Sequence, residues 1–383
     1  MKLSILLPTR NGGPLLEPVI GSILTQDCDD FELVVSNNAS ADATAEIIAS
    51  FASDARLKVM TLQEPVAVTD NWNVALGACS GEYVTLIGDD DLLLPGYSDR
   101  VLGLLDEYDD PDSLTFNGYA YAFPGFGGAQ HSHYADPFFT PDPLVPVDGL
   151  VSAGTRKKLV SEMFSFRFPL HLNMQTSLVS RRMLERLPHG LFRPPFPDFY
   201  GLNAIMLVAD RWAISSAKPV VIGVSPKSFG RTLHSREQGA GLDYLGISTG
   251  FDGQLPGNEV INGTYLTLIE LERDFPAALR GTRIDRDEYV MQQVYAWYLH
   301  RRLRSLTNRE VAQRLRLLSA RDAAGLVRMT ASRLQPSTLK RWLRIDRDEP
   351  VGDLWPGMQP LPEVSDIVEF AHWLVARRPA RAA

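Results

Sequence analysis

The segment EYVTLIGDDD, residues 82–91, combines a strand pattern with three carboxylates at its end. Its centre is almost wholly apolar, which is typical of a parallel strand buried on both faces. Similar runs occur at LSILLP (3–8), FELVVS (31–36) and KPVVIGVS (218–225), and the stretches between the early runs have helical spacing. This alternation over residues 1–118 predicts an α/β domain with a mostly parallel sheet and helices on both faces.

The chain changes character beyond this domain. Residues 119–150 are rich in Gly, Pro and aromatic residues. We expect a long functional loop there, because so many aromatic side chains would be costly to leave in water. Strand and helix patterns then return, and a last helix is predicted near Val364–Arg377. The pattern divides the chain into three parts: residues 1–118, residues 119–257 with long loops, and a helical C-terminal region, residues 258–383.

Composition is that of an ordinary globular protein. The 383 residues are 45% apolar and 22% charged, and two cysteines in this length make no disulfide framework. The apolar start of the N-terminus is too short for a signal peptide, and no apolar run is long enough for a transmembrane helix. We therefore expect a cytoplasmic protein, or one peripheral to the inner membrane face.

Charge is distributed unevenly. The net charge is −8, yet residues 300–345 contain twelve Arg or Lys against two acids, Glu310 and Asp322. Arg and Leu alternate there in basic amphipathic helices, and one interpretation is contact with an anionic membrane surface. The alternatives are a solvated helix face or an oligomer contact. Nucleic acid is not an expected partner, because the rest of the chain is acidic.

Asp89, Asp90 and Asp91 are the most informative residues. Three adjacent carboxylates repel one another, and a hard divalent cation such as Mg²⁺ or Mn²⁺ would offset that repulsion. Their position supports this interpretation, because ligands of open parallel sheets gather at the carboxyl ends of strands. The alternative is a solvated acidic loop near the N-terminus of the helix that follows Pro95.

Four segments together resemble the family 2 glycosyltransferases. They are SILLPTRNGG (4–13), FELVVSNNASADAT (31–44), DNWNVALGACSGEYVTLIGDDDLLLPG (70–96) and, more weakly, FPDFYGL (196–202). The resemblance implies a GT-A fold, which is Rossmann-like, and inverting transfer of a sugar from a nucleotide-diphosphate sugar to an acceptor hydroxyl. It makes residues 1–118 the donor-binding half and residues 119–257 the acceptor-binding half of that fold.

The resemblance also assigns candidate donor-binding residues. Asn37 falls where family members usually carry an Asp that contacts the base, so a UDP-sugar is favoured only weakly. Within Asp89–Asp91, one carboxylate is expected at the ribose and another at Mn²⁺ or Mg²⁺. Asp90 or Asp91 is favoured for the cation, and the allocation stays open. The full set of donor-binding candidates is Pro8, Thr9, Arg10, Asn11, Asn37, Asn38, Asn73, Asp89 and Asp90.

Asp198 is the candidate catalytic base. The resemblance places it near the acceptor, and the alternative is a simple N-cap for the following helix. His234 is a candidate further ligand for the metal or the diphosphate, and the alternative is an exposed loop histidine. The acceptor would be a glycan or a lipid-linked saccharide of bacterial glycan synthesis. Two other functions remain open: a nucleotidyltransferase and a non-catalytic nucleotide-sugar-binding module.

Overall fold

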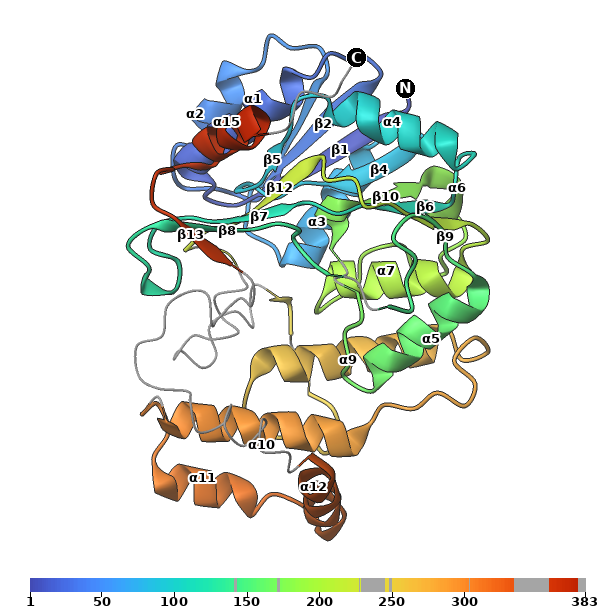
Figure 1. Cartoon of the computed structure of the whole chain (residues 1–383), viewed down its shortest axis with the longest axis vertical. Helices are drawn as coiled ribbons and strands as arrows, with labels where there is room; N and C mark the ends of the chain where they lie inside the picture. Colours follow the sequence, from blue (N-terminus) through green and yellow to red (C-terminus); the bar gives the residue numbers. More distant parts are fainter. Residues whose placement is uncertain are drawn as a thin grey trace.

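The computed structural model describes residues 1–140, 143–170, 173–226, 228, 245–247, 250–302, 304–333 and 358–377. Two sheets form its centre (Figure 1). The first has the strand order β3-β2-β1-β4-β10-β6-β11-β9. Its strands are β1 (Leu3–Thr9), β2 (Phe31–Asn37), β3 (Leu57–Thr61), β4 (Tyr83–Leu86), β6 (Ser113–Thr115), β9 (Gly149–Leu150), β10 (Ser177–Ser180) and β11 (Trp212–Ile214).

The first four strands of this sheet are parallel, as the sequence predicts. β10 is inserted antiparallel between β4 and β6, and β11 runs parallel to β6. β1 and β2 are almost completely buried because they lie inside the sheet and are covered on both faces. The predicted fold class, a mostly parallel sheet with helices on both faces and a helical C-terminal region, is confirmed.

Helices cover the first sheet on both sides (Figure 1). α1 and α4 lie on one side. Gln26, just after α1, donates to the Leu94 carbonyl and accepts the backbone N–H of Ser98 on α4. α3 packs against β1 and β2 from the other side, together with the loop that precedes α7. The bounds are α1 (Leu16–Leu24), α2 (Thr44–Ser50), α3 (Val68–Ala78), α4 (Tyr97–Glu107), α5 (Ala153–Phe164), α6 (Arg181–Leu184) and α7 (Pro197–Val208).

A buried carboxylate fastens the N-terminal ends of the first strands. Glu32 on β2 accepts hydrogen bonds from Ser4 on β1 and from the backbone and hydroxyl of Ser80, and it pairs with Lys58 on β3. Burial alone would raise the pKa of Glu32, but these donors lower it to about 2. The carboxylate is therefore charged at neutral pH and ties three strands together.

The second sheet replaces the loop that the sequence predicts over residues 119–150. Its order is β13-β8-β7-β12-β5, with β7 and β8 both inside that segment. The segment SLTFNGY (113–119) is split between β6 and β7, which belong to different sheets. The chain passes from one sheet to the other at Asn117 and Gly118. The bounds are β5 (Leu92–Leu93), β7 (Tyr119–Ala122), β8 (Ser132–Ala135), β12 (Val220–Val224) and β13 (Gln359–Leu361).

The C-terminal part of the chain returns to cover this second sheet. β13 pairs antiparallel with β8, and α15 (Ile367–Arg377) packs on β5 and β12 (Figure 1). Phe370 is completely buried, with its ring stacked on Tyr121 at 5.1 Å between centroids. Tyr134 and Trp373 extend the aromatic cluster. These contacts cover Tyr121 and Tyr134 of the predicted loop, whereas Phe126, Phe138 and Phe139 of the same segment pack in the main core.

Four helices form a separate layer below the sheets (Figure 1). α9 packs against α7, and α10 packs against α9, α11 and α12. Tyr289 and Trp297 of α10 anchor this layer by hydrogen bonds with Asn262 and the Pro256 carbonyl, 2.7 and 2.6 Å long. The bounds are α9 (Glu259–Asp274), α10 (Arg286–Arg302), α11 (Asn308–Leu315) and α12 (Ala320–Arg333). None of the helices in the described part of the chain is both long and apolar enough to cross a membrane.

The docking of α15 can be tested by truncating its central ring. Phe370→Ala would remove a fully buried side chain, and such changes cost about 3–5 kcal/mol. We expect a loss of that order in the free energy of unfolding measured by urea titration. Val375→Ala is the matched control on the same helix, because Val375 is largely exposed. Equal effects of the two substitutions would contradict the packing described for α15.

Candidate active site

The candidate residues converge at one edge of the first sheet. Thr9 ends β1, Asn37 ends β2, and Asp89–Asp91 follow β4. β1 is parallel to both of its neighbours, so these strand ends lie on the same edge. Thr9 is buried, and its hydroxyl donates a 2.6 Å hydrogen bond to Asp89. The first and fourth strands are therefore joined at the point where an open α/β sheet binds its ligands.

Asp91 is buried and forms a structural link. One carboxylate oxygen accepts the backbone N–H of Gly88 at 2.6 Å, and the other accepts that of Gly223 on β12 at 2.8 Å. Only 1% of Asp91 is exposed. Burial and the neighbouring charge of Asp90 raise the pKa of Asp91 well above its ordinary value. The side chain thus fixes the loop after β4 to the second sheet.

Two glycines make this link sterically feasible. A Cβ atom on residue 223 would lie 1.6 Å from the carbonyl oxygen of Asp90, so only glycine lets β12 pass so close to the carboxylate loop. A Cβ on residue 88 would lie 2.7 Å from the carboxylate of Asp91. The buried carboxylate of Asp91 therefore leaves no room for a side chain at residue 88.

Asp89 and Asp90 differ from Asp91 because both are partly exposed. Asp89 accepts from Thr9, as described above. Asp90 accepts from the hydroxyl of Ser228 at 2.6 Å and from the backbone N–H of Ser225 at 3.3 Å. Both serines follow β12, so hydroxyl and amide donors surround this carboxylate. Asp89 and Asp90 are the two carboxylates of the tripeptide that can reach a ligand.

The predicted asparagines lie at the same edge in different environments. Asn38 is buried, and its amide makes two hydrogen bonds with the backbone of Val66. Asn37 is also buried and accepts from the backbone N–H of Ser40. Asn11 is exposed, and its side chain accepts from the backbone of Ala41. Asn11 thus joins the loops after β1 and β2, and Asn38 joins the second of these loops to the segment after β3.

Three further donor-binding candidates were predicted from the sequence: Pro8, Arg10 and Asn73. Pro8 is partly exposed near the end of β1, and Arg10 is exposed just beyond it. Asn73 lies on α3, and its amide donates to the Phe192 carbonyl at 3.2 Å. Trp72 packs edge-to-face against the Phe192 ring, with 5.1 Å between centroids. The loop before α7 is therefore held against α3.

Asp198 lies in the first turn of α7. The N-cap of this helix is Phe196, so the interpretation of Asp198 as an N-cap is wrong. Its carboxylate accepts the backbone N–H of Phe199 at 2.8 Å. Burial raises the pKa of Asp198 to about 6. A carboxylate with that pKa is ionised at neutral pH and is a stronger base than an ordinary Asp.

The carboxylate oxygens of this site suit a metal ion that takes most of its other ligands from the substrate and water. Among the described residues, no group of three or more His, Cys, Asp or Glu side chains is arranged to hold a metal. Asp89 and Asp90 supply hard oxygen atoms, and Mg²⁺ is usually held by one or two carboxylates plus phosphate oxygens and water. Residues of that kind fit Mn²⁺ or Mg²⁺ beside a diphosphate. His234 lies outside the described residues.

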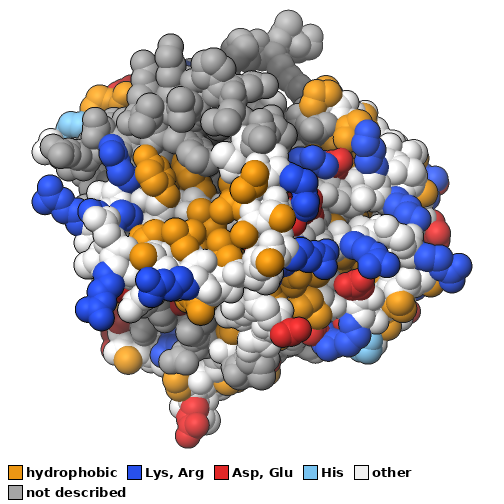
Figure 2. All heavy atoms as spheres, turned by 90° about the horizontal axis from the view of Figure 1, so that it is seen from below, with side chains coloured by type: hydrophobic (Ala, Val, Ile, Leu, Met, Phe, Trp, Pro, Cys, Tyr) orange, Lys and Arg blue, Asp and Glu red, His pale blue; other side chains and the backbone are white. Residues whose placement is uncertain are grey.

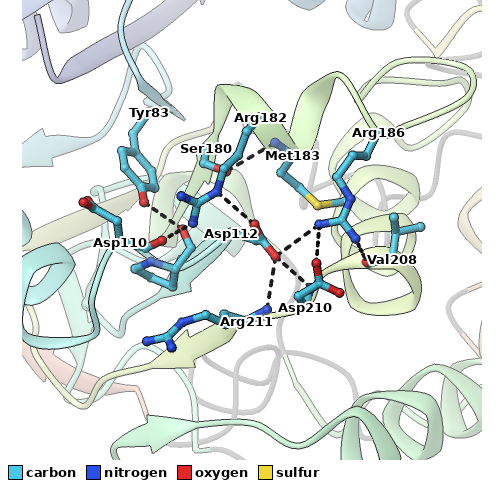
Figure 3. Close-up of polar contacts among 11 residues, drawn as sticks. Tyr83, Asp110, Asp112, Ser180, Arg182, Met183, Arg186, Val208, Asp210 and Arg211 are labelled. Carbon is cyan, nitrogen blue, oxygen red and sulfur yellow. Dashed lines mark hydrogen bonds and ion pairs between the residues drawn. The ribbon is translucent and has the colours of Figure 1, made fainter.

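A second polar cluster lies at the opposite edge of the first sheet and was not predicted from the sequence. Asp112, just before β6, accepts from Arg182 at 3.1 Å and from the backbone of Asp210 at 2.7 Å, and it pairs with Arg186 at 3.4 Å (Figure 3). An open cavity of about 520 Å³ adjoins the cluster. The ion pairs and hydrogen bonds of Asp112 join the loops before β6 and β11 to the helix α6. Its only sequence signal is the acidic stretch DDPD (109–112).

Comparison with family models finds one match in the N-terminal part of the chain. Residues 4–164 match the model of the family described as Glycosyl transferase family 2. This segment is therefore similar to that family. The family segment contains β1 to α5 and therefore includes Asp89, Asp90 and Asp91.

Individual relatives match about a third of this chain. The GalNAc(5)-diNAcBac-PP-undecaprenol beta-1,3-glucosyltransferase of Campylobacter jejuni is 36% identical over 124 residues, which are 32% of this chain and 37% of that protein. Glycosyltransferase GlyA of Streptococcus pneumoniae is 29% identical over 31% of this chain and 17% of that protein. The chain thus spans well under half the length of these relatives. The solved structure of S. aureus TarS 1–349 in complex with UDP-GlcNAc covers 92% of this chain and 80% of its own, with 15% identity and a TM-score of 0.49.

The close approach of β12 to the carboxylate loop gives a direct prediction. Gly223→Ala would place a methyl group against the Asp90 carbonyl, and overpacking of this kind costs about 1–3 kcal/mol or more. We expect a lower free energy of unfolding in urea titrations. Gly77→Ala on α3 is the matched control, because no atom lies within 4 Å of its new Cβ. It should be neutral or slightly stabilising, and a Gly223 variant as stable as the parent would refute the contact.

Proposed function

We propose that this chain is a metal-dependent, inverting glycosyltransferase. It would transfer a sugar from a nucleotide-diphosphate sugar to a hydroxyl of a glycan or a lipid-linked saccharide. The family 2 segment and the relatives named as glycosyltransferases support the reaction class. The observation that carries the proposal is the set of carboxylates at the carboxyl end of β4, fastened to both sheets through Thr9 and Gly223. A cytoplasmic location stays a prediction.

Asp89 and Asp90 would serve the donor. Asp89 is held by Thr9 at the end of β1, where the ribose of a nucleotide is expected. Asp90 would hold Mn²⁺ or Mg²⁺, with the serines after β12 fixing its orientation. When bound, the cation would neutralise negative charge on the leaving diphosphate. Asp91, the other carboxylate favoured from the sequence, would act by positioning this loop, because its oxygens already accept two backbone N–H groups.

Asp198 would accept the proton of the attacking hydroxyl. A general base works best when its pKa lies near the working pH, and the pKa of about 6 satisfies this condition. The acceptor oxygen would then attack the anomeric carbon in one step with inversion, forming the new glycosidic bond while the bond to the nucleoside diphosphate breaks. The proton of the acceptor hydroxyl would move to the Asp198 carboxylate. This reaction needs no covalent enzyme intermediate. The carboxylate must be ionised before the acceptor reacts.

Replacing the proposed base should separate binding from transfer. Asp198→Asn keeps an oxygen that can accept from Phe199 but removes the base. We expect unchanged donor affinity by calorimetry and a fall in the transfer rate of about 10²–10⁴-fold. In the parent enzyme, kcat/KM should fall tenfold per pH unit below about pH 6, because protonation of Asp198 removes the active form.

Asp106→Asn is the control for this substitution, because Asp106 is exposed near the C-terminal end of α4. Its rate and pH profile should match those of the parent. Parent-like transfer by the Asp198 variant would exclude Asp198 as the base, while the donor-binding proposal would stand.

Asp90→Asn tests the donor site separately. The substitution removes one negative charge beside the proposed cation, and we expect donor affinity in Mn²⁺ to fall at least about tenfold, as for loss of one charge-assisted contact. A panel of UDP- and GDP-sugars in calorimetry, with and without Mn²⁺, measures this effect and identifies the nucleotide. Asp99→Asn on α4 is the exposed control. Equal donor affinity of the Asp90 variant and the parent would remove Asp90 from the site.

A further inference from the structure

The outer surface of α11 and α12 combines exposed apolar side chains with arginines. Leu315, Leu317 and Val327 are 42%, 58% and 69% exposed. Figure 2 views the molecule from the side on which these helices lie and shows apolar side chains gathered in the middle of the face, with Lys and Arg around them. We call this surface the α11–α12 face. Its exposed arginines include Arg309, Arg316 and Arg321.

The cationic character of this face is not offset locally. Residues 301–333 contain nine arginines and only two acidic residues. Glu310 is used as a capping box, accepting from the backbone and hydroxyl of Thr307. Asp322 is buried and pairs with Arg286 of α10 at 3.0 Å. Both carboxylates are therefore engaged within the helical layer, and the outward charge is positive.

Packing within the protein does not require the exposed apolar residues. α11 contains no buried residue, and Val311 and Leu318 pack partly against the main core. α12 is already held to α10 by the Asp322 pair and by Arg328, which bonds to Asp287 at 2.7 Å. Leu315, Leu317 and Val327 are exposed and take no part in these ion pairs. Exposed apolar groups ringed by charge are typical of an interaction site.

We propose that the α11–α12 face docks on an anionic lipid surface. Apolar side chains would enter the headgroup region, while the arginines contact lipid phosphates. A second copy of this chain fits less well, because a symmetric contact would bring two strongly positive faces together. Nucleic acid would match the charge but not the apolar centre. The proposal is independent of the transfer reaction, since it concerns only where the protein is held.

Vesicle sedimentation tests the proposal with the full chain. We expect binding to vesicles containing phosphatidylglycerol at low salt, weaker binding at 0.5 M salt, and little binding to pure phosphatidylcholine. Arg309→Gln and Arg316→Gln should each reduce binding about fivefold, as expected for one cationic side chain near an anionic surface. The double variant Leu317→Gln/Val327→Gln should also reduce it, because both side chains are already in water and the fold does not depend on them.

Matched substitutions elsewhere serve as controls. Arg280→Gln and Val147→Gln alter exposed residues outside the α11–α12 face and should leave vesicle binding unchanged. The proposal is overturned if the parent does not sediment with anionic vesicles at low salt, if neutral vesicles bind it equally, or if the controls lose binding as much as the test variants. Sedimentation velocity without lipid measures whether the protein forms a dimer. A dimer abolished by Leu317→Gln/Val327→Gln would assign the face to self-association instead.

Discussion

The arrangement of the site depends on one buried carboxylate. Asp91 accepts backbone hydrogen bonds from Gly88 behind it and from Gly223 across the sheet boundary. An ionisable group this deeply buried is costly unless its oxygens are satisfied, and here the backbone satisfies both. β5 begins at the next residue and pairs with β12. The two sheets therefore meet at Asp91, and the loop between them has little freedom to move.

Because this loop is fixed, the three adjacent carboxylates lie in different environments. Asp91 faces the protein interior, while Asp89 and Asp90 stay within reach of a ligand and are oriented by hydroxyl groups. Such preorganisation matters for catalysis, because oriented groups need not rearrange when charge develops on a substrate. The second sheet thus helps to position the carboxylates proposed to bind the donor, although most of its residues lie far from β4 in the sequence.

The α/β order and the acidic tripeptide could be predicted, because buried strands and the residues that follow them are recognised from neighbouring residues in the sequence. The burial of Asp91 was not predictable, because its partner Gly223 lies 132 positions away. The division of SLTFNGY (113–119) between two sheets was hidden for the same reason. No local break marks it, and Gly118 at the crossover lies close to Val220, about 100 positions away. The aromatic residues of 119–150 were predicted to need cover. α15, which covers Tyr119, Tyr121 and Tyr134, could not be identified from local sequence.

The position of α15 has a consequence for synthesis of the chain. Tyr121 and Phe370 stack on each other across about 250 residues of sequence. At translation rates of about 5–20 residues per second, the aromatic surface of β7 and β8 remains uncovered for roughly 10–50 s after it leaves the ribosome. During that interval the nascent protein exposes apolar strand surface that favours aggregation. Chaperones, or helices of the chain that are already folded, would have to cover this surface.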